Sequence, residues 1–183
     1  MHSEILLVTL ANAIAKKKVI ELTAIALEND ELFEQLLEFS FHPKPEVAFR
    51  AAWILENIYL ANPQKFIPHL NWFLINFPQQ QNSSARRNFA KILALITKKN
   101  AQKEIKEIVH QFKTDDLVET VFAWLIDDEV AVAIKSHCLN ILANLSTKHN
   151  WIKDELLQTM NFLVDKESIA FYAKVKQIKK QLK

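Results

Sequence analysis

The stretch that decides the fold is "HPKPEVAFRAAWILENI", residues 42–58, because its apolar pattern returns 38 residues later in "SSARRNFAKILALI", residues 83–96. Aligning the two stretches pairs Val47 with Ala85, Ala52 with Ala90, Ile54 with Ile92, Leu55 with Leu93, and Ile58 with Ile96. A third copy, "IKSHCLNILANL" at 134–145, has Ile-Leu at the same place. The shared apolar residues recur every three or four positions, which is the spacing of a helix buried along one face. The chain therefore repeats one helical unit.

Helical spacing extends over nearly the whole chain of 183 residues, and no segment shows the alternation of a strand. We expect helices at 5–15, 19–28, 30–41, 44–61, 63–77, 83–96, 103–112, 114–125, 128–146, 150–164 and 167–181. Short linkers make successive helices antiparallel neighbours. One amphipathic hairpin cannot bury its own apolar face, whereas a stack of hairpins can.

The predicted fold is all-α: a right-handed α–α superhelix, or solenoid, of about ten short antiparallel helices. It forms a single domain over residues 1–183. Residues 1–18 and 165–183 are expected to be capping helices at the two ends of the stack.

The composition argues against several classes of enzyme. Glycine is absent, although an average protein contains about 7%. Without glycine there is no P-loop, no dinucleotide-binding turn and no G-x-S-x-G nucleophile elbow. The six histidines are scattered, without H-E-x-x-H or C-x-x-C spacing, and no catalytic triad can be read from the order of residues. We therefore expect no catalytic residues, no metal and no cofactor.

Compartment and membrane association are inferred from two features. Cys138 is the only cysteine, so it is expected to be a buried thiol in a reducing, cytoplasmic compartment. The apolar run at 5–15 is too short to span a bilayer, and its positive charges follow it instead of preceding it. We expect it to form the first helix and expect no membrane partner, with a cleaved signal peptide as the alternative.

A family resemblance is carried by residues 45–77, "PEVAFRAAWILENIYLANPQKFIPHLNWFLINF". This stretch resembles a HEAT repeat: a first helix with the pattern P-x-V-x-x-x-A-A-x-x-L, then a second helix that opens with proline and contains Ile-Pro-x-Leu. The likeness continues over 83–98 and 128–164. The aspartate and arginine typical of the family are mostly missing, and only Arg86, after Ala85, fits. The resemblance implies an α-solenoid that binds partners and carries out no chemistry.

The candidate binding surface follows from that resemblance, because second helices line the concave face of such solenoids. On residues 63–77 the side chains that lie off the apolar stripe are spaced by three or four, so they share one face: Lys65, His69, Trp72 and Asn76. Tryptophan is a frequent anchor of interfaces. On the preceding second helix Glu34 and Glu38 belong to a polar face that is expected to border the same groove. The predicted partner is an unidentified protein or peptide, and packing of Trp72 against an adjacent repeat is the alternative.

Two other tryptophans, Trp53 and Trp151, are assigned to packing. Replacing Trp53 with alanine is expected to cost about 3–5 kcal/mol, whereas Trp72→Ala is expected to cost little.

The rival function is nucleic-acid binding, because charge is segregated along a chain whose net charge is only +2. Residues 86–113 hold eight basic and two acidic side chains, 114–129 hold six acidic and no basic ones, and 166–183 hold six basic and one acidic. The alternative patch consists of Arg86, Arg87, Lys91, Lys98 and Lys99. A more specific form of this rival function is a HEAT-like DNA glycosylase, with Trp124 near Asp127 and Asp128. The other possibility is that the basic block pairs with the acidic block.

Overall fold

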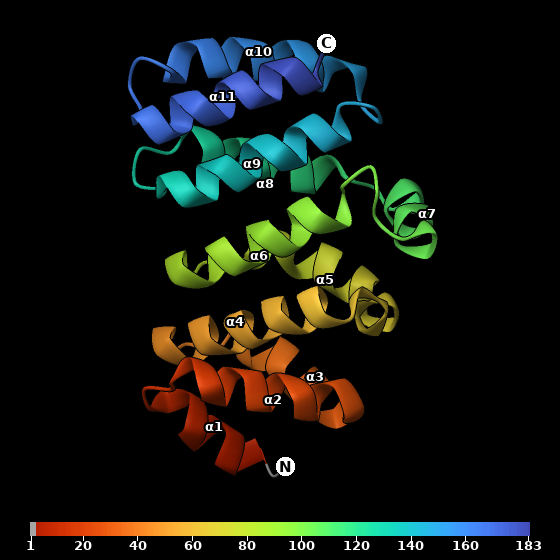
Figure 1. Cartoon of the computed structure of the whole chain (residues 1–183), viewed down its shortest axis with the longest axis vertical. Coiled ribbons are helices and arrows are strands. Elements are labelled where there is room, and N and C mark those ends of the chain that lie inside the picture. Colours follow the sequence, from red (N-terminus) through yellow and green to blue (C-terminus); the bar gives the residue numbers. More distant parts are fainter. Residues whose placement is uncertain (1–2) are drawn as a thin grey trace. The chain divides into compact units, whose positions relative to one another are not determined.

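The computed structural model describes residues 3–183, and this range is helical with no strand. It has eleven α-helices, so the all-α prediction is confirmed (Figure 1). They are α1 (Ser3–Ala11), α2 (Lys16–Glu28), α3 (Asp30–Phe39), α4 (Pro45–Ala61), α5 (Leu70–Asn76), α6 (Ser83–Ile96), α7 (Lys103–Gln111), α8 (Asp115–Ile126), α9 (Val132–Leu145), α10 (Asn150–Leu163) and α11 (Ile169–Gln181). Two 3-10 segments, η1 (Pro63–His69) and η2 (Phe77–Gln79), flank α5.

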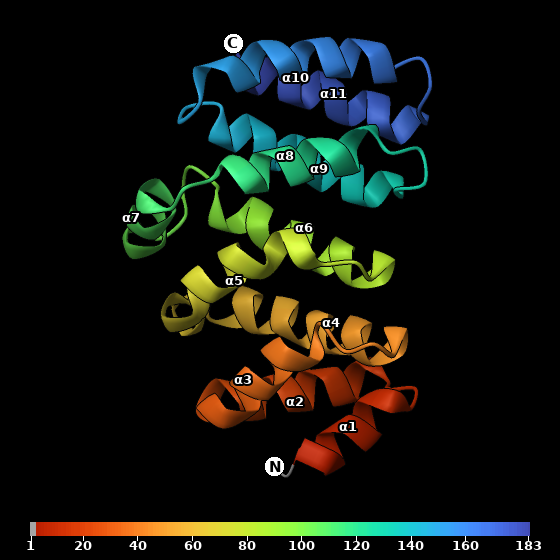
Figure 2. The same cartoon turned by 180° about the vertical axis from the view of Figure 1, so that it is seen from behind.

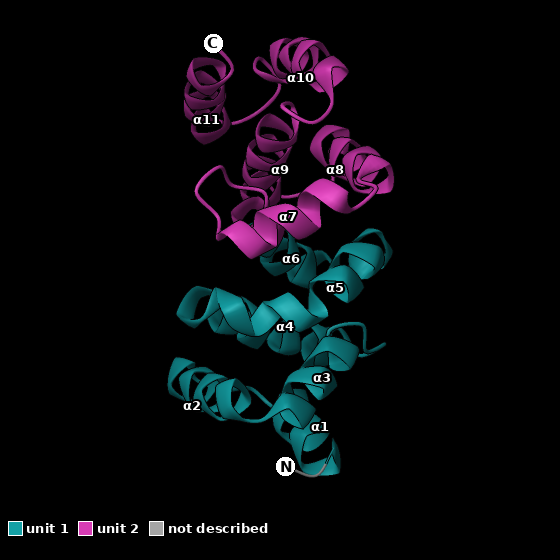
Figure 3. Ribbon diagram, turned by 90° about the vertical axis from the view of Figure 1, so that its right-hand side faces the viewer, with its two compact units in different colours: residues 1–92 teal, residues 93–183 magenta. Residues whose placement is uncertain are grey.

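The chain forms two compact units, residues 1–92 and 93–183, coloured separately in Figure 3. The boundary falls inside α6. Each unit has its own core, and they are described one at a time.

Unit 1 is built around α4, which packs against α1, α2, α3 and η1 (Figure 1). The buried alanines Ala51 and Ala52 leave room for these neighbours to approach closely. The helix begins with Pro45, whose fixed φ suits a first helical position. Asn29 starts α3 as an N-cap, because its side chain accepts a hydrogen bond from the Leu32 amide at 2.9 Å.

Phenylalanines fill much of the core of unit 1. Phe66 makes an edge contact with Phe33, at 5.1 Å between ring centroids, and another with Phe73 at 6.0 Å. Phe73 in turn stacks on Phe89 of α6 at 5.0 Å. All four rings are fully buried, so α3, η1, α5 and the start of α6 share one continuous core.

Unit 2 is built around α9, which packs against α8, α10 and α11 (Figure 2). Cys138 on α9 has no exposed surface, as the sequence predicts. Lys135, three residues earlier, is also buried, and its ammonium forms an ion pair with Glu167 from the segment before α11. The additional helix predicted at 103–112 is α7, which lies beside the α8–α9 pair in both views (Figures 1 and 2).

The single helix predicted at 63–77 is wrong. Residues 63–69 are 3-10, and only Leu70–Asn76 is α-helical. Pro68 explains the difference, because proline has no N–H to donate and its ring clashes with the carbonyl four residues earlier. The tighter 3-10 winding avoids that clash.

The first and last helices, α1 and α11, lie within the predicted capping ranges 1–18 and 165–183. Helix α1 ends at Ala11, and Arg50 of α4 donates a hydrogen bond to the Leu10 carbonyl at 2.6 Å. Ala15 is extended, and Lys16 then begins α2. The last helix, α11, begins at Ile169 after Ser168, whose side chain accepts from the Phe171 amide as an N-cap.

Candidate functional site

The predicted partner-binding residues lie on three segments of unit 1, namely α3, η1 and α5. Glu34 and Glu38 lie on α3 and are exposed. Lys65 and His69 lie on η1, Trp72 and Asn76 lie on α5, and all four are half-buried. The structure therefore places these residues partly against their neighbours, instead of on a fully solvated helix face.

Lys65 and His69 meet the start of α3. The ammonium of Lys65 is 2.6 Å from Oδ1 of Asp30, and this contact lowers the pKa of the Asp30 carboxyl. The imidazole of His69 stacks on Phe33, with ring centroids 4.6 Å apart and planes inclined by 25°. Partial burial lowers the pKa of His69, and the negative charges of Glu34 and Asp30 oppose that effect. Asp30, Glu34, Lys65 and His69 therefore form one mixed-charge cluster.

Trp72 has one contact through its ring and one through its backbone. Its ring meets Phe41 edge-on, at 5.8 Å between centroids. The amide of Asn76 donates to the Trp72 carbonyl at 2.8 Å, one helical turn along. Only the Phe41 contact involves the ring itself, and part of Trp72 remains exposed.

Ile75 is the residue of this surface that the sequence analysis missed. It lies three positions after Trp72 on α5 and is 62% exposed. Residues three apart on a helix are neighbours, so Ile75 extends the apolar area beside Trp72. Its exposure could have been predicted from the sequence, because an isoleucine between Leu74 and Asn76 lies off the apolar stripe. We call Trp72, Ile75 and Asn76, with the adjoining cluster of Asp30, Glu34, Lys65 and His69, the Trp72 surface.

Residues 7–182 match the family model of the HEAT repeat domain. The chain belongs to the HEAT-repeat family. Its eleven helices and lack of strands within residues 3–183 agree with the α-solenoid of that family, so the resemblance seen in the sequence is confirmed. Neither a curated protein nor a solved structure matches the chain.

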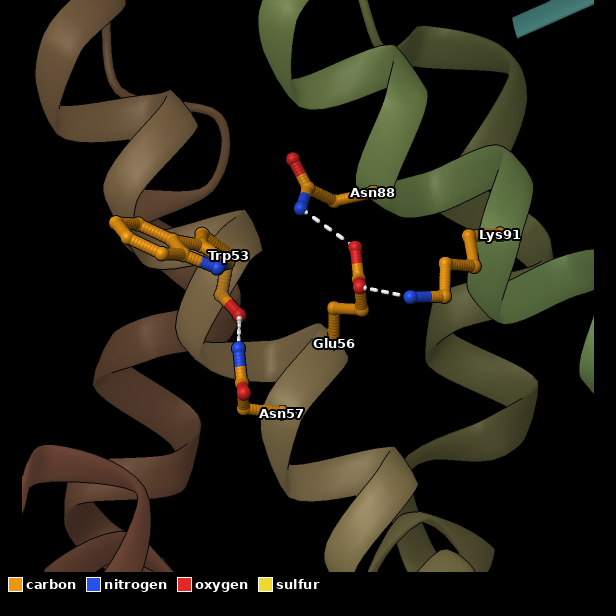
Figure 4. A network of polar contacts seen from close by, with 5 residues as sticks. All are labelled: Trp53, Glu56, Asn57, Asn88 and Lys91. Carbon is orange, nitrogen blue, oxygen red and sulfur yellow. Dashed lines mark hydrogen bonds and ion pairs between the residues drawn. The ribbon is translucent and has the colours of Figure 1, made fainter. Parts of the chain in front are cut away.

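This HEAT-repeat chain links its successive first helices without the usual aspartate and arginine. Glu56 of α4 is buried and accepts hydrogen bonds from the Asn88 amide at 2.7 Å and the Lys91 ammonium at 2.5 Å, both from α6 (Figure 4). The Asn57 amide donates to the Trp53 carbonyl at 2.8 Å on the same helix. A similar bond joins the segments that precede these two helices: the side-chain amide of Gln80 donates to the Ser40 carbonyl at 3.0 Å.

Some residues of the predicted nucleic-acid patch of this HEAT-repeat chain are bonded within the protein and so are less free to contact phosphates. Lys91 is bonded to Glu56, and Arg86 donates to the Gln80 carbonyl at 3.0 Å and to the Gln81 side chain at 3.3 Å. Arg87 is exposed on α6. Lys98 and Lys99 are also exposed, and they line a pocket in unit 2 that is described below. Two of the five predicted residues thus already have internal partners.

The other three tryptophans differ in how deeply they are buried. Trp124 is only 5% exposed and lies in the core of unit 2, which argues against a role in a glycosylase-like site with Asp127 and Asp128. Trp53 is half-buried and stacks on Phe49 at 6.0 Å. The expectation for Trp151 holds for one face of its ring, which stacks on Phe122 at 6.0 Å, yet 52% of the residue is exposed.

Within residues 3–183 we examined the free thiol and the side chains that could bind a metal. Burial raises the pKa of the Cys138 thiol to about 12, which keeps it protonated and unreactive at neutral pH. Across residues 3–183 there is no group of three or more histidine, cysteine or acidic side chains able to hold a metal ion. Nor does any helix in that range have the length and apolar content to cross a membrane. Families of this kind are typically non-catalytic and mediate protein interactions.

Proposed function

We propose that the protein is a non-catalytic scaffold that binds a protein or peptide partner through the Trp72 surface of unit 1. The supporting observation is the pairing of Trp72, whose ring packs edge-on against Phe41, with Ile75, which is 62% exposed. A rigid aromatic side chain loses little conformational entropy on binding, so it suits the centre of an interface.

The surroundings of Trp72 give this surface its specificity. The half-buried Lys65 forms an ion pair with the exposed Asp30, and Glu34 and Glu38 add negative charge along α3. Such groups contribute orientation and partner choice more than affinity. The preferred partner presents an apolar side chain for Trp72 and Ile75, with a basic group placed to reach Glu34 and Glu38. The proposed compartment is the cytoplasm, which rests on the single buried thiol of Cys138.

The test is affinity capture with quantitative mass spectrometry, using the wild-type chain, Trp72→Ala, and Trp151→Ala as a matched control. Trp151 is a suitable control because it is an exposed tryptophan of unit 2. Circular dichroism first establishes that the variants are folded. We expect proteins captured by the wild type and by Trp151→Ala to be lost with Trp72→Ala. An identical set of proteins captured by all three chains contradicts the proposal.

A further inference from the structure

Unit 2 contains a pocket of about 710 Å³ that is separate from the Trp72 surface and includes Lys98 and Lys99 of the predicted nucleic-acid patch. It lies where the C-terminal ends of α6, α7, α9 and α11 come together, with the start of α10 on one side. Pockets that hold small ligands have volumes of about 300–1,000 Å³. The volume is therefore large enough to admit a ligand of drug-like size, such as one or two amino-acid side chains of a partner.

The charged side chains that line this pocket are all basic. No carboxylate is among the lining residues, and the cationic side chains come from four segments: Lys98, Lys99, Lys106, Lys148 and Lys153, with His110 beside them. We call this site the basic pocket. Four of its ammonium groups, all but that of Lys148, belong to exposed residues and form no ion pair within residues 3–183.

Lys148 has a structural role. Its ammonium donates to the carbonyls of Val109 at 3.1 Å, His110 at 2.9 Å and Phe112, which closes the C-terminal end of α7. This arrangement supplies hydrogen-bond donors that the last turn of a helix needs. It also fixes a positive charge in the wall of the basic pocket.

Helix ends account for only two of the other four lysines. Lys98 and Lys99 follow the end of α6, where cations complement the helix dipole. Lys106 is in the middle of α7, and Lys153 is near the N-terminal end of α10, where a positive charge is unfavourable. Bringing four exposed ammonium groups around one pocket is electrostatically unfavourable unless an anion lies among them.

The floor of the pocket is apolar and ordered. Ile96, Val109, Leu145 and Leu182 contribute aliphatic side chains that are almost fully buried. Asn144 lies among them, with its amide donating to the Ala94 carbonyl and to Thr97 Oγ1, both at 3.2 Å. The Asn144 side-chain oxygen accepts from the Gln181 amide at 3.0 Å. These bonds join α6, α9 and α11 beneath the pocket, so its shape is set before a ligand arrives.

We infer that the basic pocket binds a short acidic peptide segment, whose carboxylates reach the lysines and whose aliphatic side chain rests on the floor. Proteins that bind single-stranded nucleic acids stack bases on aromatic rings and use arginine. The lining here has no arginine, and its only ring is the imidazole of His110. The inference extends the proposed function, peptide recognition, to a second site with its own partner chemistry.

The experiment is fluorescence anisotropy with labelled probes of known composition. The first probe is a short peptide of alternating glutamate and aspartate with leucine at its centre. The second replaces every acid with glutamine or asparagine, and the third is an oligouridine of similar length. Each is titrated with the wild-type protein, with Lys98→Glu/Lys99→Glu, and with Lys16→Glu/Lys17→Glu as a charge-matched control. Lys16 and Lys17 are exposed residues of α2 in unit 1, so they make no part of the pocket.

We expect the acidic peptide to bind the wild type and the control alike, and its dissociation constant to rise about tenfold or more in Lys98→Glu/Lys99→Glu. The neutral peptide should bind at least about tenfold more weakly than the acidic one. Three results would overturn the inference: no binding of the acidic peptide, equal loss in the control variant, or tight binding of oligouridine in its place.

Trp72→Ala separates this inference from the proposed function. It should leave affinity for the acidic peptide unchanged, because Trp72 is in unit 1 and outside the pocket. If the acidic peptide still binds while Trp72→Ala captures the same proteins as the wild type, the proposed function fails and the basic pocket stands. If the acidic peptide does not bind while Trp72→Ala loses the captured proteins, the inference about the basic pocket fails and the proposed function stands.

Discussion

The carboxylate of Glu56 on α4 contacts the ammonium of Lys91 on α6 at 2.5 Å, across 35 residues of sequence. The second carboxylate oxygen accepts from the Asn88 amide at 2.7 Å. One buried acid thus joins two helices that the sequence pairs by their common apolar pattern. In a solenoid, contacts of this kind between neighbouring repeats carry much of the stability.

Replacing Glu56 with alanine should therefore destabilise unit 1. The substitution leaves the Asn88 amide and the Lys91 ammonium without their shared acceptor, and a lost buried partner of this kind costs about 1–3 kcal/mol. Urea unfolding followed by circular dichroism measures the change. Lys91→Met should cost less, because Lys91 is a third exposed and its methylene groups are retained. A double-mutant cycle with no coupling between positions 56 and 91 would show that the contact does not stabilise the fold.

The loss of stability caused by replacing each tryptophan with alanine should increase with the burial of that tryptophan. Trp124 is 5% exposed, so Trp124→Ala should cost about 3–5 kcal/mol, as for other large core truncations. Trp151 is 52% exposed, so Trp151→Ala should cost roughly 1 kcal/mol. Trp53 and Trp72 are both half-buried, which places them between these values and removes the large difference between them that the sequence suggests. Thermal melts of the four variants give the order directly, and a smaller effect at Trp124 than at Trp151 would be incompatible with the structure.

Stability should fall below neutral pH because of His69. Burial lowers the pKa of His69 in the folded chain below its ordinary value of 6.5, so the unfolded chain takes up the proton first. The contribution of His69 to stability is present above that value and is lost as the pH falls through it toward the lower folded-state pKa. Urea unfolding of the wild type and of His69→Gln at pH about 7.5 and about 5.5 tests this, within the range where histidine titrates. The variant should show a smaller loss at the lower pH; an equal loss in both chains would assign the effect to other groups.

The sequence could predict most helices because their apolar residues repeat on one face. Val47 and Ala85 sit at corresponding positions of α4 and α6, and both observed helices begin and end within a residue of the predicted ranges. The prediction of one continuous helix at 63–77 was wrong because Pro68 acts through its own backbone. Apolar spacing does not reveal this local effect. Spacing also leaves undecided whether the second side of a helix is covered, which is why Trp53 and Trp151 turned out more exposed than expected.

Polar partners were harder to predict, because they come from distant parts of the chain. The block of charge that contains Lys91 gives no sign that its partner is Glu56. Likewise, Lys106 and Lys153 are far apart in sequence, and only the packing of α7, α9 and α10 brings them to the same pocket. The mixed-charge cluster also contains Asp30, which pairs with Lys65 from 35 residues further along the chain.

The most direct test of the proposed function is site-specific photocrosslinking in cells. A photoreactive benzoylphenylalanine is placed at the position of Ile75, which is 62% exposed beside Trp72, and in a control chain at the position of Ile126, which is 55% exposed in unit 2. We predict a discrete crosslinked partner from position 75 that disappears when Trp72→Ala is added to the same chain, and that is absent from position 126. Crosslinking that is the same at both positions, or that persists without Trp72, would contradict binding through the Trp72 surface.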